Sequence, residues 1–223
     1  MAYVSIAIDG PAGAGKSTIA KAVAKKLGFV YVDTGAMYRA MALFFIQNGI
    51  GADEEEKIYS VLDKVEIGIE YENGVQQVYL NGENVNDRIR TEEVSHMASA
   101  SSVYPKVRIK LVELQRAIAA GANVIMDGRE IASYVLPNAD LKIFLTASVD
   151  VRAKRRYDEL RAKGEEVDLE DIKKDIAERD YRDSHRDFAP LVQVPDAILV
   201  DTSDMGIDEV IEKIIGLAKK LVD

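Results

Sequence analysis

The segment that most constrains the fold of this chain is Gly10-Pro-Ala-Gly-Ala-Gly-Lys-Ser17, which fits the pattern GxxxxGK[ST]. It follows a β-branched run at residues 4–9 and precedes a helical pattern at residues 18–27. A glycine-rich turn in that position aims successive backbone N–H groups at one anion, while Lys16 adds positive charge and Ser17 offers a hydroxyl to Mg²⁺. The sequence therefore predicts a phosphate-binding loop (P-loop) between a strand and a helix, rather than a glycine-rich turn without a ligand.

Four further β-branched runs, at residues 29–33, 123–127, 141–146 and 197–201, have the composition of buried parallel strands. Helical patterns follow each of them. We therefore expect an α/β fold in which helices cover both faces of a parallel sheet. A length of 223 residues suits one domain, spanning 1–223, better than two independent domains.

Residues 65–86 interrupt this rhythm, because apolar and polar residues alternate there with a period of two. Asn-Gly pairs at 73–74 and 81–82 divide the segment into three parts. Asn-Gly between alternating runs is a strong signal for a hairpin turn. We expect a three-stranded antiparallel insert outside the main sheet, within residues 62–92.

Composition argues against several other classes of protein. A formal charge of −9 is unsuited to a broad nucleic-acid surface, which needs basic residues. The chain has no cysteine, so disulfides, thiolate zinc sites and cysteine nucleophiles are excluded. The longest apolar run, residues 40–46, is far shorter than the ~20 residues of a membrane span, and no basic segment precedes the N-terminal apolar stretch. We expect a cytoplasmic monomer with no nucleic-acid or membrane partner.

Acids, hydroxyls and arginines follow the second and third predicted strands, at the sheet edge where such folds bind ligands. An arginine there can hold a second phosphate, a threonine can contact a ligand or cap the following helix, and an acid can hold Mg²⁺ directly or through water. An Asp-Gly pair is also an ordinary turn. The residues are Asp33, Thr34 and Arg39 after the second strand and Asp127, Arg129 and Glu130 after the third, and the expected Mg²⁺ ligands are Ser17, Asp127 and Asp33.

Two clusters of arginines in the last third of the chain each share one face of a predicted helix. Charge runs of this kind are often solvated faces that nearby acids neutralise. Beside a P-loop, however, planar bidentate cations suit the charge that spreads over a phosphoryl group during transfer. The clusters are Arg179, Arg182, Asp183 and Arg186, at i, i+3, i+4 and i+7, and Arg152, Arg155 and Arg156, at i, i+3 and i+4.

Several segments together resemble one family, the bacterial cytidylate kinases, a branch of the nucleoside monophosphate kinases. The likeness covers nearly the whole chain, and the insert at 65–86 also looks like one that marks the bacterial members. The segments are GPAGAGKST, DTGAMYRA, KVRIKLVELQR, DGRE with VLPNADLKIFLTAS, RAKRR, and RDYRDSHRDFAPL before a strand that ends in Asp-Thr-Ser. The resemblance implies a P-loop kinase fold with a lid at about residues 153–170.

The resemblance also implies roles for individual residues, of which Ser99 and Arg108 come from the resemblance alone. The expected ATP-binding residues are Gly10, Pro11, Ala12, Gly13, Ala14, Gly15, Lys16, Ser17, Thr18 and Arg152. The expected CMP-binding residues are Thr34, Arg39, Ser99, Arg108, Arg129, Glu130, Arg179, Asp183 and Arg186. Catalysis is expected to depend on Lys16, Arg156, Arg179 and Arg186.

The activity that the resemblance implies is in-line transfer of the γ-phosphoryl group of ATP to CMP, and to dCMP, with Mg²⁺ as cofactor. A kinase for UMP or for another small metabolite is the alternative. A GTPase-like switch would need Asn-Lys-x-Asp, but no asparagine here precedes a lysine. The chain leaves the family pattern GRD-x-GT at Gly128-Arg-Glu-Ile-Ala-Ser133, where we expect the Glu130 carboxylate to face the amino group of cytosine.

Overall fold

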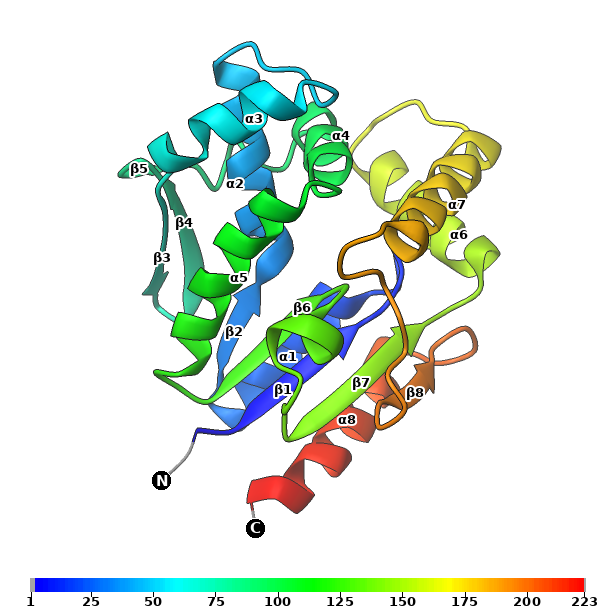
Figure 1. The fold of residues 1–223 in the computed structure, drawn as a ribbon. Coiled ribbons are helices and arrows are strands. Elements are labelled where there is room, and N and C mark those ends of the chain that lie inside the picture. The colour runs from blue at the N-terminus through cyan, green and yellow to red at the C-terminus, as the bar shows by residue number, and fades with distance from the viewer. Residues whose placement is uncertain (1–2, 223) are drawn as a thin grey trace.

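The main sheet of the protein has five parallel strands in the order β2-β6-β1-β7-β8. The structure is a computed structural model that describes residues 3–222 (Figure 1). The expected parallel sheet is confirmed, and each strand begins within one residue of its predicted start. The strands are β1 Ser5–Asp9, β2 Val30–Asp33, β6 Val124–Gly128, β7 Leu141–Thr146 and β8 Ile198–Asp201.

Helices cover both faces of this sheet because its strands are apolar on both sides. In β1, Ile6 and Ile8 pack into the layer formed by α1 and α8, whereas Ala7 packs into the layer formed by α2 and α5. No helix within residues 3–222 is long and apolar enough to span a membrane. The helices are α1 Lys16–Leu27, α2 Thr34–Gln47, α3 Glu55–Val61, α4 Glu92–Ser101, α5 Pro105–Ala119, α6 Val149–Ala162, α7 Leu169–His185 and α8 Ile207–Val222, with a 3-10 turn at Leu62–Lys64 and a π-helical turn at Ile131–Val135.

The predicted insert is a separate antiparallel sheet of three strands, in the order β3-β4-β5. Asn73 and Gly74 have φ angles of 52° and 75°, and Asn81 and Gly82 have φ angles of 49° and 84°. Positive φ at both central residues defines the turn that Asn-Gly favours, so both hairpin predictions are confirmed. The strands are β3 Ile67–Glu72, β4 Val75–Leu80 and β5 Glu83–Asn84.

Helices α6 and α7 form an arm with a small core of its own, which contains Ala153, Leu160, Ile172 and Ile176. The two helices are joined by residues 163–168, which lie within the segment 153–170 that the sequence indicated as a lid. In Figure 1 the arm and the insert stand on opposite sides of the molecule. One detail of the prediction is wrong: α7 ends at His185, and Arg186 is its extended C-cap residue rather than part of the helix.

Candidate active site

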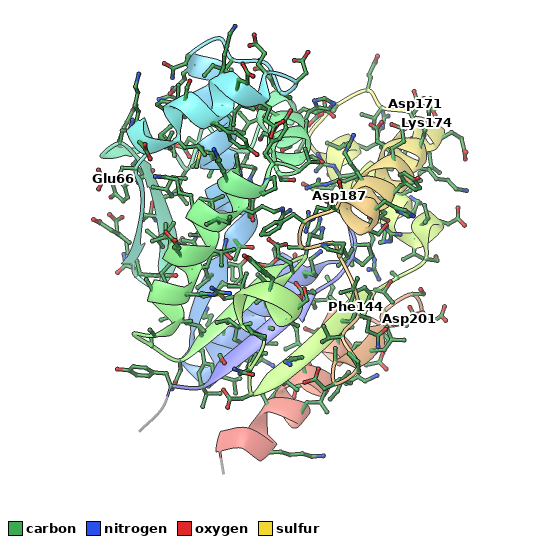
Figure 2. All side chains as sticks on the ribbon, in the orientation of Figure 1. Glu66, Phe144, Asp171, Lys174, Asp187 and Asp201 are labelled. Carbon is green, nitrogen blue, oxygen red and sulfur yellow. The ribbon has the colours of Figure 1, made fainter. Side chains whose placement is uncertain are left out.

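A cleft of about 960 Å³ lies at the carboxyl ends of β1, β2 and β6. In Figure 2 Asp201, the last residue of β8, marks this edge of the sheet, where open parallel sheets bind their ligands. Of the predicted site residues, Gly10, Pro11 and Arg152 do not line the cleft. Those that do are Ala12, Gly13, Ala14, Gly15, Lys16, Ser17, Thr18, Asp33, Thr34, Arg39, Ser99, Arg108, Asp127, Arg129, Glu130, Arg156, Arg179, Asp183 and Arg186.

The P-loop has a backbone that only glycine fits at two places. A Cβ atom on Gly10 would lie 1.9 Å from the carbonyl oxygen of Leu145, so any side chain there would collide with β7. Gly15 is the N-cap residue of α1 and has a φ of 84°, in the left-handed region that favours glycine. The loop therefore leads from β1 into the N-terminus of α1, where backbone N–H groups and the helix dipole attract an anion.

Lys16 is a buried cation, with only 5% of its surface exposed. Its ammonium group donates a hydrogen bond to the carbonyl oxygen of Pro11 at 2.8 Å, and within the described residues it forms no ion pair. Burial, together with the charges of Arg129 and Arg179, holds the pKa of Lys16 well below its usual value. An anion in the cleft would stabilise the charged form of this side chain.

Arg179 is a second cation of the cleft without an ion-pair partner among the described residues, and its side chain is half-buried. Its Nε atom has no hydrogen-bond partner there either. Burial, followed by the charge of Arg129, lowers the pKa of Arg179 to about 10. Because an uncompensated buried charge is unfavourable, Lys16 and Arg179 together indicate a site for an anionic ligand.

Ser17 and Asp127 bring oxygen atoms together beside Lys16. The Ser17 hydroxyl donates to Oδ2 of Asp127 at 2.7 Å, and the Tyr31 hydroxyl donates to Oδ1 at 2.8 Å. Burial and the neighbouring charge of Asp33 raise the pKa of Asp127. A bound cation would favour the charged form of Asp127 and so lower this pKa. Hydroxyl and carboxylate oxygens are ligands that suit Mg²⁺. In the described part of the chain no three His, Cys, Asp or Glu side chains gather as a metal cage, so an ion here would draw further ligands from phosphate and water.

Asp33 has the capping role that we considered for Thr34. Its carboxylate accepts from the N–H of Ala36 at 2.8 Å and caps α2, whereas the Thr34 hydroxyl donates to the carbonyl oxygen of Asp127 at 2.6 Å. The proposal that Thr34 caps the helix is therefore wrong. Asp33 also accepts from Arg39 at 3.1 Å, which holds that guanidinium at the cleft wall.

The insert contacts the cleft through Asp33, which the sequence did not indicate. The amide of Gln76 accepts from the backbone N–H of Asp33 at 2.8 Å and donates to its carbonyl oxygen at 3.2 Å, in the way a neighbouring strand would. Arg90 donates to the Asp33 carboxylate at 3.2 Å. The insert thus helps to fix the end of β2.

Glu130 lies at the centre of a buried network. Its Oε1 accepts from Arg108 and, at 2.9 Å, from the Tyr38 hydroxyl, and its Oε2 accepts from Arg186 at 3.1 Å. The backbone N–H groups of the following turn donate to the buried Asp9 carboxylate, which holds the turn in place. Both carboxylate oxygens of Glu130 therefore already have arginine partners.

Asp183, on α7, connects the arm to Arg129, which directly follows β6. Its Oδ2 accepts from Nε of Arg129 at 2.8 Å. Burial alone would raise the pKa of Asp183, but the charges of Arg129, Arg179 and Arg186 together hold it below its usual value. This cluster confirms that residues predicted on separate elements meet at one place, although sequence reasoning did not give their pairing.

The three arginines of α6 have different surroundings. Arg155 donates to the carbonyl oxygen of Thr202 at 2.8 Å, and Arg156 pairs with Glu159 at 3.1 Å on the exposed face. Arg152 instead is buried beneath the P-loop, where it donates to the carbonyl oxygen of Ala147 at 2.8 Å. Of this cluster, Arg155 and Arg156 line the cleft.

Comparison with known sequences gives matches along the whole chain. A family model described as Cytidylate kinase matches residues 6–220. The cytidylate kinase of Halalkalibacterium halodurans is 50% identical over 222 residues, with 100% of each chain covered. The cytidylate kinase of Leuconostoc mesenteroides subsp. mesenteroides is 53% identical over 217 residues, with 97% of each chain covered.

Comparison with solved structures gives neighbours of low sequence identity. An uncharacterized protein from Eubacterium ventriosum has a TM-score of 0.53 at 14% identity, covering 97% of this chain and 98% of that one. A gluconokinase from Sinorhizobium meliloti has a TM-score of 0.50 at 14% identity, covering 98% of this chain and 95% of that one. These likenesses show the fold, and the sequence matches show that the chain belongs to the cytidylate kinase family, as its motifs indicated.

Proposed function

We propose that this protein transfers the γ-phosphoryl group of ATP to CMP, and to dCMP. The observation that carries the proposal is a pair of cations without carboxylate partners among the described residues, the buried Lys16 and the half-buried Arg179, which line one cleft with the P-loop. Membership of the cytidylate kinase family supports the choice of acceptor. A phosphoryl group between Lys16 and Arg179 would supply the negative charge that these two cations lack.

The P-loop end of the cleft is the proposed site for ATP. Residues 10–18 would surround its phosphates, with Lys16 nearest to the charge that develops on transfer. Arg156 would approach the same phosphates from the arm. Ser17 and Asp127, with Asp33 nearby, would hold Mg²⁺. When bound, this ion neutralises phosphate charge.

The remaining wall of the cleft, together with Arg179 beside Lys16, is the proposed site for CMP. Its arginines would bind the acceptor phosphate, and its remaining polar groups would contact the ribose and base. Ser99 supports this assignment, because the residue lines the cleft and its buried hydroxyl has no hydrogen-bond partner among the described residues. The proposed set is Thr34, Arg39, Ser99, Arg108, Arg129, Glu130, Arg179, Asp183 and Arg186.

The proposed reaction needs no covalent intermediate with the protein. The two ends would align an oxygen of the acceptor phosphate with the γ-phosphorus, and Lys16, Arg179 and Arg186 would stabilise the charge that spreads in the transition state. Water in the cleft would hydrolyse ATP. The part of the arm near residues 153–170 is the proposed lid that excludes it.

One screen tests this proposal and its alternative. ATP consumption is measured with CMP, dCMP, UMP, AMP, GMP and no acceptor, each with Mg²⁺ and with excess EDTA. We expect turnover with CMP and dCMP that depends on Mg²⁺, and little ATP hydrolysis without an acceptor. Preference for UMP would replace the proposed acceptor with the alternative, and equal turnover without any acceptor would overturn the kinase assignment.

A further inference from the structure

The arm is fastened to the P-loop at one residue, Ala12, through both its backbone N–H and its carbonyl oxygen. The backbone N–H of Ala12 donates to Oδ1 of Asp180, on α7, at 3.0 Å. The carbonyl oxygen of Ala12 accepts from Nη1 of Arg152, on α6, at 2.8 Å. Arg152 and Asp180 also form an ion pair with each other. The two side chains and the backbone of Ala12 therefore contact one another in a closed ring.

The Nε and Nη1 atoms of Arg152 both donate to groups within the protein. Its Nε donates to the carbonyl oxygen of Ala147, at the end of β7, and only 5% of the side chain is exposed. A Cβ atom on Gly13 would lie 3.2 Å from Cβ of Arg152, so α6 packs directly beneath the loop. Arg152 therefore supports the P-loop from behind while Arg155 and Arg156 line the cleft.

Asp180 directly follows Arg179, the half-buried cation of the cleft that forms no ion pair among the described residues. Both belong to α7, whose backbone is rigid at this point because it is continuous from Leu169 to His185. Fixing Asp180 on the peptide of Ala12 also fixes Arg179 relative to Lys16, which lies four residues further along the P-loop. The two cations that need a phosphoryl group are thus held at a set separation.

We propose that Asp180 and Arg152 form a latch on Ala12, as positioning residues that keep the arm and the P-loop in register for phosphoryl transfer. This inference deepens the proposed kinase function and rests on it. The latch also confines movement of the arm to the part beyond it, toward the connection 163–168 and the start of α7, near which Figure 2 labels Asp171.

The test combines turnover with binding of a ligand that lacks adenine. Asp180→Ala, Arg152→Ala, the double variant and Arg152→Lys are compared with Asp175→Ala, an exposed acid on the same helix. The measurements are kcat and KM with ATP and CMP, the affinities for ATP and for inorganic tripolyphosphate, and Tm.

The latch predicts a shared loss in the two single alanine variants. We expect each to lower kcat about tenfold or more while KM for CMP changes less than about threefold, and the double variant to lose no more than the worse single. Arg152→Ala should weaken ATP and tripolyphosphate by the same factor, since it loosens the loop and touches no adenine. Arg152→Lys should recover part of the loss, because it keeps one donor and the charge.

Specific results would overturn the latch. They are a kcat for Asp180→Ala within about twofold of the parent protein, additive losses in the double variant, or a loss of ATP affinity in Arg152→Ala without loss of tripolyphosphate affinity. The last result would make Arg152 a ligand of adenine. If the parent protein does not phosphorylate CMP, the proposed function fails, whereas tripolyphosphate binding still decides the latch.

Discussion

The two ends of the cleft differ in how their cations are balanced. At what we call the carboxylate end, formed by Asp33, Asp183 and Glu130, arginines are already paired. At the P-loop end, Lys16 has no ion pair among the described residues, and the same holds for Arg179 beside it. The pairs of the carboxylate end are Arg39–Asp33, Arg129–Asp183, Arg108–Glu130 and Arg186–Glu130.

This difference in pairing determines what each end of the cleft requires of its ligand. Paired arginines are held in place before any ligand arrives, so they can select by shape and position. Unpaired buried cations are unfavourable until an anion joins them, and the lowered pKa values of Lys16 and Arg179 reflect that cost. The carboxylate end is therefore organised for specificity, and the P-loop end for binding and stabilising phosphoryl charge.

The largest effect is expected from Lys16→Ala. We expect kcat to fall at least about a thousandfold, because this cation serves transferring charge. Stability should not fall, since a buried and uncompensated charge is removed. Steady-state kinetics and thermal unfolding check this, with Lys21→Ala, an exposed lysine of the same helix, as control. A variant that retains most of its kcat would show that Lys16 does not stabilise the transferring charge.

Arg179→Ala and Arg186→Ala contrast an unpaired arginine with a paired one. Both should lower kcat about a hundredfold while ATP affinity changes less than about threefold, because both act on developing charge. Only Arg186→Ala should also destabilise the fold, by about 1.5 to 3 kcal/mol, because Glu130 loses one of its two arginine partners and keeps Arg108. Urea unfolding and ATP titration separate the two, with Arg182→Ala as the control; equal stability losses would contradict the contrast.

Glu130→Gln is expected to act more weakly and on selectivity. A carboxylate that faces position 4 of the base favours the amino group of cytosine, whereas an amide can also donate to the carbonyl of uracil. The ratio of kcat/KM for CMP over UMP should fall about tenfold, mainly through better use of UMP. Glu130→Asp, which restores the family residue, should keep the ratio above that of Glu130→Gln.

The structure adds a second possible outcome for Glu130→Gln. Because Glu130 pairs with Arg108 and Arg186, the amide would also weaken their positioning. A loss of kcat with both acceptors at an unchanged ratio would show that Glu130 positions the arginines and does not read the base. That result would leave the carboxylate end without its proposed reader.

The sequence predicted what depends on neighbouring residues. The P-loop is specified by glycines that the local backbone requires, and the strands by short apolar runs, so the sheet was predicted correctly, and most of the predicted site residues line one cleft. The placement of Asp33, Asp127 and Arg129 at one edge followed from the parallel topology. Their roles in binding CMP and Mg²⁺ remain predictions.

What the sequence did not predict depends on long-range partners. Asp9 accepts from Ile131, 122 residues away, and Asp180 accepts from Ala12, 168 residues away, so no local pattern marks either acid. Tyr38 lies in an apolar helix, and its polar role depends on hydrogen bonds with Glu130 and Arg108 that no local pattern indicates. Helical spacing also extended α7 over Arg186, because periodicity alone does not reveal where a C-cap begins.

The smallest expected effect concerns Asp9, which lies between the two ends because it closes β1 before the P-loop and holds the turn after Glu130. Its carboxylate accepts from the N–H groups of Ile131 at 2.9 Å and Ala132 at 2.7 Å. Burial is the main cause that raises the pKa of Asp9 to about 6, although these hydrogen bonds oppose it.

A raised pKa means that the folded protein binds the Asp9 proton more tightly than the unfolded chain does. The stabilisation from this proton is complete below the unfolded pKa of 3.8 and is lost as the pH rises through about 6. Between pH 5 and pH 7, the free energy of unfolding of the parent protein should therefore fall by about 1 kcal/mol relative to Asp9→Asn. Urea unfolding of both proteins across this range measures the difference. If the unfolding free energies of the two proteins instead change in parallel with pH, Asp9 has an ordinary carboxyl pKa. Burial of the Asp9 carboxylate would then not destabilise the folded protein at neutral pH.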